Sequence, residues 1–336
     1  MSPLQRHPSN PVLAPADIPY EATLIFNAGV VKLQGKYVCV FRNDIGEVGK
    51  AKFRGTNLGL ATSDDGVSWS VDAEPCIGVD FARELLRDFY PDRDVHYEIL
   101  RFYDPRLTVI EGRVLMCFAV DTRHGLRGGM AWTDDFQKWE VVHLTAPDNR
   151  NLVLFPERIG GDYLRLERPF NSYGGGLLGA DLFSVWLSRS SDMRRWGDTH
   201  LVLAAQDVPF ANDKIGPAAP PVRTKQGWLT TFHAVHVDDT LGKRGWEDRW
   251  TKTYYAGLML LDGDDPSRVI AMGKEPLLVP ETPEERDGFR NDVIFPGGML
   301  LEDDGEVKIY YGAADTVECL ATAHVDDLLA WLHASK

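Results

Sequence analysis

The sequence has 336 residues, of which 44% are hydrophobic and 26% are charged, and these are ordinary values for a globular protein. A core of this size needs neither a metal nor a disulfide to be stable. The 36 lysines and arginines against 50 aspartates and glutamates give a formal net charge of −14, which argues against nucleic acid or an anionic membrane as the main partner but allows a small anionic substrate at a local basic cluster.

The N-terminal residues contain no apolar segment of signal-peptide length. No stretch approaches the roughly 20 apolar residues of a membrane helix. The four cysteines are far apart in the sequence and form no Cys-x-x-Cys pair: Cys39, Cys76, Cys117 and Cys319. We interpret them as reduced thiols and expect a cytoplasmic protein.

One pattern recurs five times along the chain. In each copy an apolar segment leads into a short turn rich in glycine or charge, and a second apolar segment follows, which is typical of a β-hairpin. The five hairpins occupy residues 26–42, 103–120, 151–169, 214–235 and 291–315.

Each hairpin is followed by a third strand-like segment. The first four of these lead into turns that contain aspartate, whereas the fifth leads into a helix-like tail with Leu328, Leu329 and Leu332 on one stripe. Repeats with three or four strands each are typical of propeller blades. The sequence therefore predicts an all-β, five-bladed β-propeller with a short C-terminal helix, in which residues 1–336 form one domain. A further helix is expected at residues 81–89, and a β-sandwich with coincidental turns is the alternative fold.

The hairpins predict where a site would lie. The first strand of a hairpin starts at the edge where the second strand finishes, so in a propeller all of these ends share one rim. The starts carry Asn27, Tyr103, Asp104, Arg106, Arg150, Asn151, Lys214 and Asn291, and the finishes carry Arg42, Asp121, Arg168, His233 and Asp315. Such groups beside apolar strands are costly to desolvate without a partner, so their convergence predicts a functional mouth. The alternative for any single residue is that it braces its own blade.

The predicted mouth combines several cations with few acids. Arginine suits bidentate recognition of phosphate, lysine binds phosphate as a point charge, and carboxylates and amides suit sugar hydroxyls. Inverting hydrolysis of a glycoside needs a second carboxylate that activates water. Phosphate is already an anion and needs positioning and charge compensation instead. The composition of the mouth therefore favours a sugar phosphorylase over a hydrolase.

Six segments resemble glycoside hydrolase family 130, the β-mannoside phosphorylases. They are FNAGVV at Phe26, YDPRLT at Tyr103, RNLVLFPERI at Arg150, KIGPAAPP at Lys214, FHAV at Phe232 and YYGAADTV at Tyr310. The resemblance extends from about Asn10 to Asp327, and the order of several matching segments makes it specific.

The resemblance implies a role for individual residues. Asp104 matches the family's general acid, whose proton reaches the glycosidic oxygen through the mannose 3-hydroxyl. Asn27, Arg42 and Asp315 match residues that hold the mannose, and the match to the phosphate pocket covers Arg150, Asn151, Lys214 and His233. The implied reaction is reversible and inverting: a β-mannoside and phosphate give α-mannose 1-phosphate and a shortened acceptor. Inorganic phosphate would be a co-substrate, and neither a metal nor an organic cofactor is implied.

Some positions depart from the family pattern. Tyr103 replaces the glutamate that many members have before the Asp-Pro-Arg motif, and Glu167 replaces a histidine in the third blade. The loop after Arg42 is long and ends near Arg54. We expect these positions to border the acceptor, and we expect Tyr103, Arg168 and Arg54 to bind substrate, although Arg54 could equally be a solvated loop charge.

A second loop, at residues 242–255, offers flat aromatic faces that suit sugar rings. Its Trp246, Trp250 and Tyr254 could stack on an acceptor, and Asp248 and Arg249 could hold hydroxyls. A contact between subunits is the competing use, because aromatic residues also favour interfaces.

Two other functions compete with the phosphorylase. An inverting β-mannoside hydrolase of the same fold would need Asp315 or Glu167 as the base for water, and a sugar-binding propeller would need no acid at all. In each case the partners are small molecules, an oligosaccharide with or without phosphate, and self-association is possible. The sequence leaves the linkage (β-1,4 or β-1,2) and the acceptor sugar open.

Overall fold

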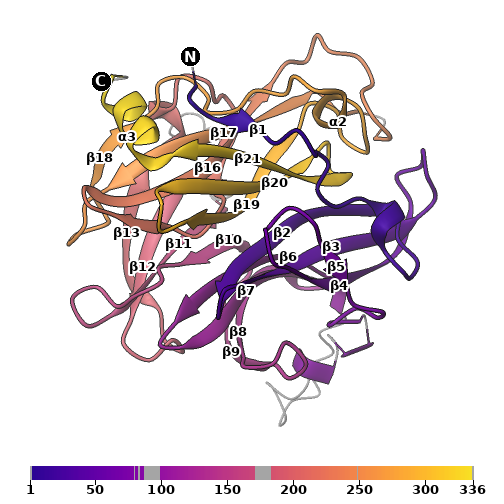
Figure 1. The fold of residues 1–336 in the computed structure, drawn as a ribbon, viewed down its shortest axis with the longest axis horizontal. Coiled ribbons are helices and arrows are strands. Elements are labelled where there is room, and N and C mark those ends of the chain that lie inside the picture. Colours follow the sequence, from indigo (N-terminus) through magenta and orange to yellow (C-terminus); the bar gives the residue numbers. More distant parts are fainter. Residues whose placement is uncertain are drawn as a thin grey trace.

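The computed structural model describes residues 2–78, 80–81, 84–86, 99–170, 183–247 and 249–334. Within these ranges the chain forms five antiparallel sheets arranged as the blades of a propeller (Figure 1). The predicted five-bladed β-propeller is therefore confirmed. Most of the helix expected at residues 81–89 lies outside the described residues.

The first three blades each contain four consecutive strands, numbered from the channel outward. The first blade consists of β2 (Leu24–Leu33), β3 (Lys36–Gly46), β4 (Phe53–Ser63) and β5 (Ser70–Val71). The second consists of β6 (Ile99–Ile110), β7 (Arg113–Thr122), β8 (Gly125–Thr133) and β9 (Glu140–Leu144). The third consists of β10 (Asn149–Leu154), β11 (Tyr163–Pro169), β12 (Val185–Ser190) and β13 (Gly197–Leu203).

The last two blades depart slightly from this pattern. In the fourth, two short strands pair with the same neighbour, so its members are β14 (Lys214–Pro217), β15 (Val222–Thr224), β16 (Gly227–Val237), β17 (Lys252–Leu261) and β18 (Val269–Met272). The fifth consists of β19 (Ile294–Leu301), β20 (Glu306–Ala313), β21 (Val317–His324) and, as its outermost strand, β1 (Gln5–Arg6). Short helices complete the fold: η1 (Pro15–Asp17), η2 (Ala205–Asp207), α2 (Pro283–Arg286) and α3 (Val325–Ala334).

The N-terminal strand closes the ring. Gln5 and Arg6 of β1 pair with Thr322 and Ala321 of β21, so the two ends of the chain share one blade (Figure 1). Arg6 also donates from Nε to the buried carboxylate of Glu285 at 2.7 Å. The repeat pattern did not predict this closure, because a two-residue strand carries no periodicity of its own.

The C-terminal helix packs as its apolar stripe predicts. Leu328, Leu329 and Leu332 of α3 are buried in a cluster formed by the fourth and fifth blades. Burial of each leucine stabilises the folded state by roughly 1.5–3 kcal/mol. The helix therefore covers apolar edges of those two blades, away from the predicted mouth.

The innermost strands of three blades carry a β-bulge where a predicted site residue stands. The strand register shifts between Phe26 and Gly29, between Tyr103 and Arg106, and between Arg150 and Val153. The bulged residues Asn27, Asp104 and Asn151 have φ of 54°, 56° and 59°. Asparagine and aspartate tolerate this left-handed conformation better than other side chains that carry a Cβ. A bulge redirects a side chain, and here each turns a polar group into the channel mouth.

Candidate active site

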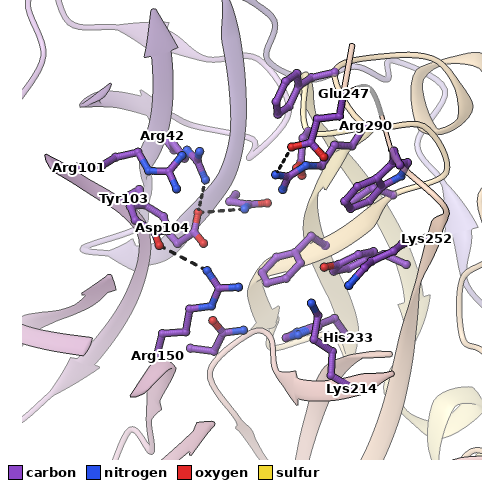
Figure 2. Close-up of a pocket in the computed structure, with 18 of the residues that line it drawn as sticks. Arg42, Arg101, Tyr103, Asp104, Arg150, Lys214, His233, Glu247, Lys252 and Arg290 are labelled. Carbon is purple, nitrogen blue, oxygen red and sulfur yellow. Dashed lines mark hydrogen bonds and ion pairs between the residues drawn. The ribbon is translucent and has the colours of Figure 1, made fainter. Parts of the chain in front are cut away.

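The predicted mouth is a pocket of about 440 Å³ at one end of the channel. Ten of the eleven predicted site residues line it: Asn27, Arg42, Tyr103, Asp104, Arg150, Asn151, Arg168, Lys214, His233 and Asp315. They come from all five blades. In Figure 2, Asp104 and Arg42 lie on one side of the pocket and Lys214, His233 and Lys252 on the other.

Arg54 is the exception. Its side chain is 62% exposed, forms an ion pair with Glu21 and does not line the pocket. Arg54 lies in β4 at the register shift opposite Ile45 and Gly46 of β3, whereas its neighbour Phe53 and Ala51 of the preceding loop do reach the pocket. The expectation that Arg54 binds substrate is therefore wrong for this structure, and its alternative as a loop charge holds.

Asp104 is fixed by two neighbours from the first blade. Its Oδ1 accepts hydrogen bonds from Asn27 Nδ2 at 3.0 Å and from Arg42 Nη1 at 3.1 Å. Burial raises the pKa of Asp104, but Arg42 and Arg106 more than offset that effect, so the pKa lies below its usual value. Asp104 is therefore a carboxylate with defined geometry.

Arg42 is itself held by carboxylates and aromatic rings. Asp44 accepts from its Nε at 3.0 Å, and its guanidinium lies 4.3 Å from the centre of the Phe26 ring. The Asp44 carboxylate also accepts a hydrogen bond from Thr56. An arginine held in this way loses little further rotamer freedom when it binds a ligand, so it is well suited to orient a sugar next to Asp104.

A second group of pocket residues contains more cations than acids. Among the described residues, Arg150 and Arg168 form no ion pair, and Lys214 lies 3.5 Å from Asp213, a carboxylate that it shares with Lys252 at 2.8 Å. Arg168 Nη1 donates to His233 Nε2 at 2.9 Å, which places the histidine proton on Nδ1. Both Arg168 and His233 are buried.

Several buried donors in this group have no acceptor within the described part of the chain: Arg150 Nε, Arg168 Nε and His233 Nδ1. Buried polar groups are nearly always hydrogen-bonded in native proteins, so each unpaired donor calls for an explanation. A shared anionic ligand would satisfy several of them together.

The electrostatics agree with that interpretation. Burial, followed by the charge of Arg168, lowers the pKa of Lys214 to about 7, and burial, followed by Arg150, lowers that of Arg168 to about 9. Burial and the charge of Arg168 also hold the pKa of His233 well below its ordinary range. These groups are crowded against each other, so an anion between them would relieve their repulsion.

Small residues make room for this arrangement. A Cβ on Gly216 would lie 2.5 Å from the His233 ring, and a Cβ on Gly312 would lie 2.6 Å from Asn27 Oδ1. Any larger residue at either position would displace a site side chain.

Four charged residues of the pocket lining were not among the predicted site residues. They are Arg101, Glu247, Lys252 and Arg290. Arg290 forms ion pairs with Asp315 at 3.2 Å and with Glu247 at 2.7 Å, so it joins the mannose side of the predicted mouth to the loop at residues 242–255. Arg101 and Lys252 lie in strands, at positions where alternation between the two faces of a sheet could have suggested them.

The loop at residues 242–255 contributes to the pocket only in part. Trp250 and Tyr254 line it with stacked rings 5.7 Å apart, whereas Trp246 packs on Phe289 instead. Arg249 is not among the lining residues, and Asp248 lies outside the described residues. Trp250 is only 6% exposed, and its ring packs between Tyr254 and the Arg290 guanidinium, so stacking of this loop on an acceptor stays a prediction.

Glu167 does not border the pocket. It is buried in the third blade, where it forms an ion pair with Arg165 at 2.8 Å and accepts a hydrogen bond from Asn149 at 2.9 Å. The expectation that this position borders the acceptor is wrong, because the side chain points between strands of its own blade.

The buried carboxyl of Glu318 supports the backbone next to the site residue Asn27. Glu318 Oε2 accepts from the Ala28 amide at 3.2 Å, next to the bulged Asn27, and Glu318 is 1% exposed. Burial raises its pKa to about 8, although the Ala28 amide and the charge of Arg106 oppose the shift. Arg106 lies beneath the pocket, where it donates to the carbonyl oxygen of Ala218 at 2.7 Å.

Glu318 predicts how stability depends on pH. Folding raises the pKa of Glu318 from 4.5 to about 8, so protonated Glu318 favours the folded state. Its contribution to the free energy of unfolding is fully present below pH 4.5 and is lost as pH rises to about 8. Relative to Glu318→Gln, the wild type should lose up to about 1.4 kcal/mol of unfolding free energy per pH unit between pH 5 and 8. Urea unfolding of both proteins at several pH values measures the difference. The exposed Glu74→Gln is the control, and equal slopes for wild type and Glu318→Gln would contradict the prediction.

The described residues include no cluster of histidine, cysteine, aspartate and glutamate that could hold a metal ion. In the same part of the chain no helix is both long and apolar enough to cross a membrane. The four cysteines are free thiols in the structure.

Comparison with known proteins gives consistent results. A family model described as beta-1,4-mannooligosaccharide phosphorylase matches residues 4–334. A 1,2-beta-oligomannan phosphorylase from Thermoanaerobacter sp. (strain X514) is 30% identical over 335 residues, which cover 98% of this chain and 99% of that protein. A beta-1,4-mannooligosaccharide phosphorylase from Ruminococcus albus is 31% identical over 337 residues, which cover 97% of this chain and 90% of that protein.

Among solved structures, a beta-1,2-mannobiose phosphorylase from Listeria innocua in complex with beta-1,2-mannobiose has the same fold. It superposes with a TM-score of 0.79 at 24% identity, over 98% of this chain and 99% of that one.

Proposed function

The chain belongs to glycoside hydrolase family 130, the family of β-mannoside phosphorylases, and we propose that its pocket catalyses the reversible, inverting phosphorolysis of β-mannosides. The observation that supports this most strongly is a group of buried donors in which Arg150 and Arg168 have no carboxylate partner among the described residues and Lys214 shares one, Asp213, with Lys252. In that group, Arg150, Arg168, Lys214 and His233 would bind phosphate, with Asn151 beside them. Inorganic phosphate is the co-substrate, and the reaction as proposed needs no cofactor.

The ion pairs of the pocket distinguish a subsite for the mannose from a subsite for the phosphate. Arg42 pairs with Asp44 and Asp104, and Arg290 pairs with Glu247 and Asp315, so these cations are already neutralised and suit a neutral sugar. Arg150 and Arg168 have no carboxylate partner among the described residues, and Lys214 shares Asp213 with Lys252, so this group keeps an excess of positive charge for an anion. We therefore assign the mannose to Asn27, Arg42, Asp104 and Asp315 and the phosphate to Arg150, Arg168, Lys214 and His233.

In the proposed step a phosphate oxygen attacks the anomeric carbon from the face opposite the glycosidic oxygen. The new carbon–phosphate-oxygen bond forms as the carbon–glycosidic-oxygen bond breaks, and the leaving oxygen takes a proton supplied by Asp104. Following the family resemblance, that proton passes through the mannose 3-hydroxyl. Inversion converts the β-mannoside into α-mannose 1-phosphate and releases the shortened acceptor.

The low pKa of Asp104 sets a condition on this step. Arg42, Arg106 and Arg150 favour its carboxylate form. A phosphate bound at Arg150 would offset part of that positive charge and raise the pKa of Asp104. The acid would then acquire its proton in the loaded complex, where it is needed.

The hydrolase alternative lacks a well-placed second carboxylate. Glu167 lies outside the pocket in an ion pair with Arg165, and the other acids of the pocket, Asp315 and Glu247, are both held by Arg290. A base that activates water must be free to accept a proton at the anomeric carbon. The described residues therefore favour phosphate over water as the attacking group.

The reverse reaction tests the proposal and identifies the acceptor. Purified protein is supplied with α-mannose 1-phosphate and a panel of acceptors, such as mannose, glucose, N-acetylglucosamine and short β-mannan chains. We expect release of phosphate with at least one acceptor and a product joined by a new β-mannosidic bond. NMR of the product gives the linkage. No phosphate release with any acceptor, from protein shown to be folded, would contradict the proposed function.

A further inference from the structure

The side chain of Arg150 depends on one phenol for its position. Among the described residues, its guanidinium has a single hydrogen-bond partner, Tyr103 Oη, 3.4 Å from Nη1, and Nε has none. The other neighbour is the Phe170 ring, whose centre lies 5.7 Å away. A guanidinium held this loosely would have several orientations if the phenol were removed.

The phenol is oriented by a carboxylate behind it. Tyr103 Oη donates its proton to Asp121 Oδ1 at 2.8 Å, and Asp121 is fixed in turn by Arg101, whose Nη2 lies 3.1 Å from Oδ2. Because the hydroxyl proton points to Asp121, an oxygen lone pair faces Arg150. Figure 2 shows Tyr103 between Arg101 and Arg150 on the Asp104 side of the pocket.

Tyr103 also touches the arginine that holds the acid. The Arg42 guanidinium lies 4.9 Å from the centre of the Tyr103 ring, and that of Arg101 lies 4.3 Å from it. Tyr103 as a residue is 2% exposed, so it offers almost no surface to a sugar. These contacts make Tyr103 a link between the two proposed subsites and argue against direct contact with the acceptor.

We propose that Tyr103 and Asp121 are positioning residues that aim Arg150 at the phosphate. This inference rests on the proposed function, because it assigns Arg150 to the phosphate site. Under this proposal Tyr103 acts through Arg150, in place of the substrate-binding role expected from the sequence. The carboxylate polarises the phenol, the phenol fixes one nitrogen of Arg150, and the remaining donors of the guanidinium are left free for the anion.

Tyr103→Phe tests this directly, because it keeps the ring and its contacts with Arg42 and removes the hydroxyl alone. The KM for phosphate should rise about fivefold to tenfold, and the KM for α-mannose 1-phosphate in synthesis should rise similarly. The KM of the acceptor and kcat at saturating phosphate should stay within about twofold. A general structural defect would not separate the parameters in this way.

Asp121→Asn provides a second, independent variant. It should raise the phosphate KM in the same direction, and the double variant Tyr103→Phe/Asp121→Asn should be no worse than Tyr103→Phe, because both changes act through one hydroxyl. Additive effects of the two substitutions on the phosphate KM would contradict the proposal that Asp121 acts through the Tyr103 hydroxyl. If Tyr103→Phe does not fold, the phosphate KM of Asp121→Asn alone tests the proposal.

The chain offers a matched control outside the pocket. Tyr163 donates to Glu111 at 2.8 Å and accepts from Arg158, so it repeats the tyrosine–carboxylate–arginine arrangement among residues that do not line the pocket. Tyr163→Phe should leave every kinetic constant unchanged.

The wild type is measured first, over a range of phosphate concentrations. Turnover of the wild type without phosphate would overturn the proposed function itself. Saturable dependence on phosphate, together with an unchanged phosphate KM in Tyr103→Phe or a change confined to the acceptor KM, would overturn the inference about Tyr103 alone.

Discussion

Asp104→Asn should lower kcat for phosphorolysis of a β-mannobiose by about 10² to 10⁴, the range expected when a positioned general acid is lost. Asparagine keeps the shape of the side chain and can still accept hydrogen bonds from Asn27 and Arg42. It has no acidic proton to give to the departing oxygen. The phosphate KM should change far less than kcat, because Arg150, Arg168 and Lys214 remain in place.

The leaving group provides a second readout for this variant. An aryl β-mannoside with an acidic phenol releases a phenolate that needs no proton. The loss of kcat should therefore be much smaller on that substrate. Asp135→Asn, an exposed aspartate in an outer turn of the same blade, should have no effect. Equal losses on both substrates would show that Asp104 does not act as the acid. A wild type that binds mannosides without turnover would indicate a sugar-binding protein instead.

Lys214→Met should reduce kcat/KM for phosphate by about 10- to 100-fold, which corresponds to the loss of one charge-assisted hydrogen bond. Methionine keeps most of the aliphatic chain, so packing next to Tyr254 is largely preserved. The apparent affinity for the β-mannoside should be nearly unchanged, because the mannose is assigned to the opposite side of the pocket.

The same lysine predicts a dependence on pH. Burial and the charge of Arg168 lower the pKa of Lys214 to about 7, and phosphate binds the ammonium form. The phosphate KM should therefore rise as pH increases above about 7, by up to tenfold per unit. Phosphate ionises identically in assays of wild type and Lys214→Met, so the difference between their profiles isolates the lysine. Parallel profiles would contradict the assignment, and the exposed Lys36→Met serves as the surface control.

Much of the fold could be predicted because each blade repeats a local signal. Turn residues such as Gly35 and Gly112, with φ of 83° and 77°, fix the hairpins, and alternating apolar residues fix which face is buried. The strand that closes the ring could not be predicted, since Gln5 and Arg6 acquire their strand geometry only by pairing with β21. Its conformation depends on contacts more than 300 residues away in the sequence.

The site was predictable to the extent that it depends on strand ends. A hairpin brings its two ends to one rim, and ten of the thirteen residues that this rule named line a single pocket, the exceptions being Arg106, Asp121 and Asn291. The rule cannot find a pocket residue that lies outside the hairpins: Arg290 reaches Asp315 and Glu247 from a connection between blades. Nor does it apply to Arg54, which lies at a register shift in β4 and is exposed. Glu167 shows a second limit, because a polar residue near a strand end can pair within its own blade.

The central claim is that the group formed by Arg150, Arg168, Lys214 and His233 holds the nucleophile, so identifying what attacks the sugar is the most direct test. Purified protein is incubated with β-1,2- or β-1,4-linked mannobiose in buffers with and without inorganic phosphate, and the products are followed by proton and phosphorus NMR. We predict that α-mannose 1-phosphate and mannose form in equal amounts, and only where phosphate is present. Release of mannose alone, at the same rate in both buffers, would contradict the claim.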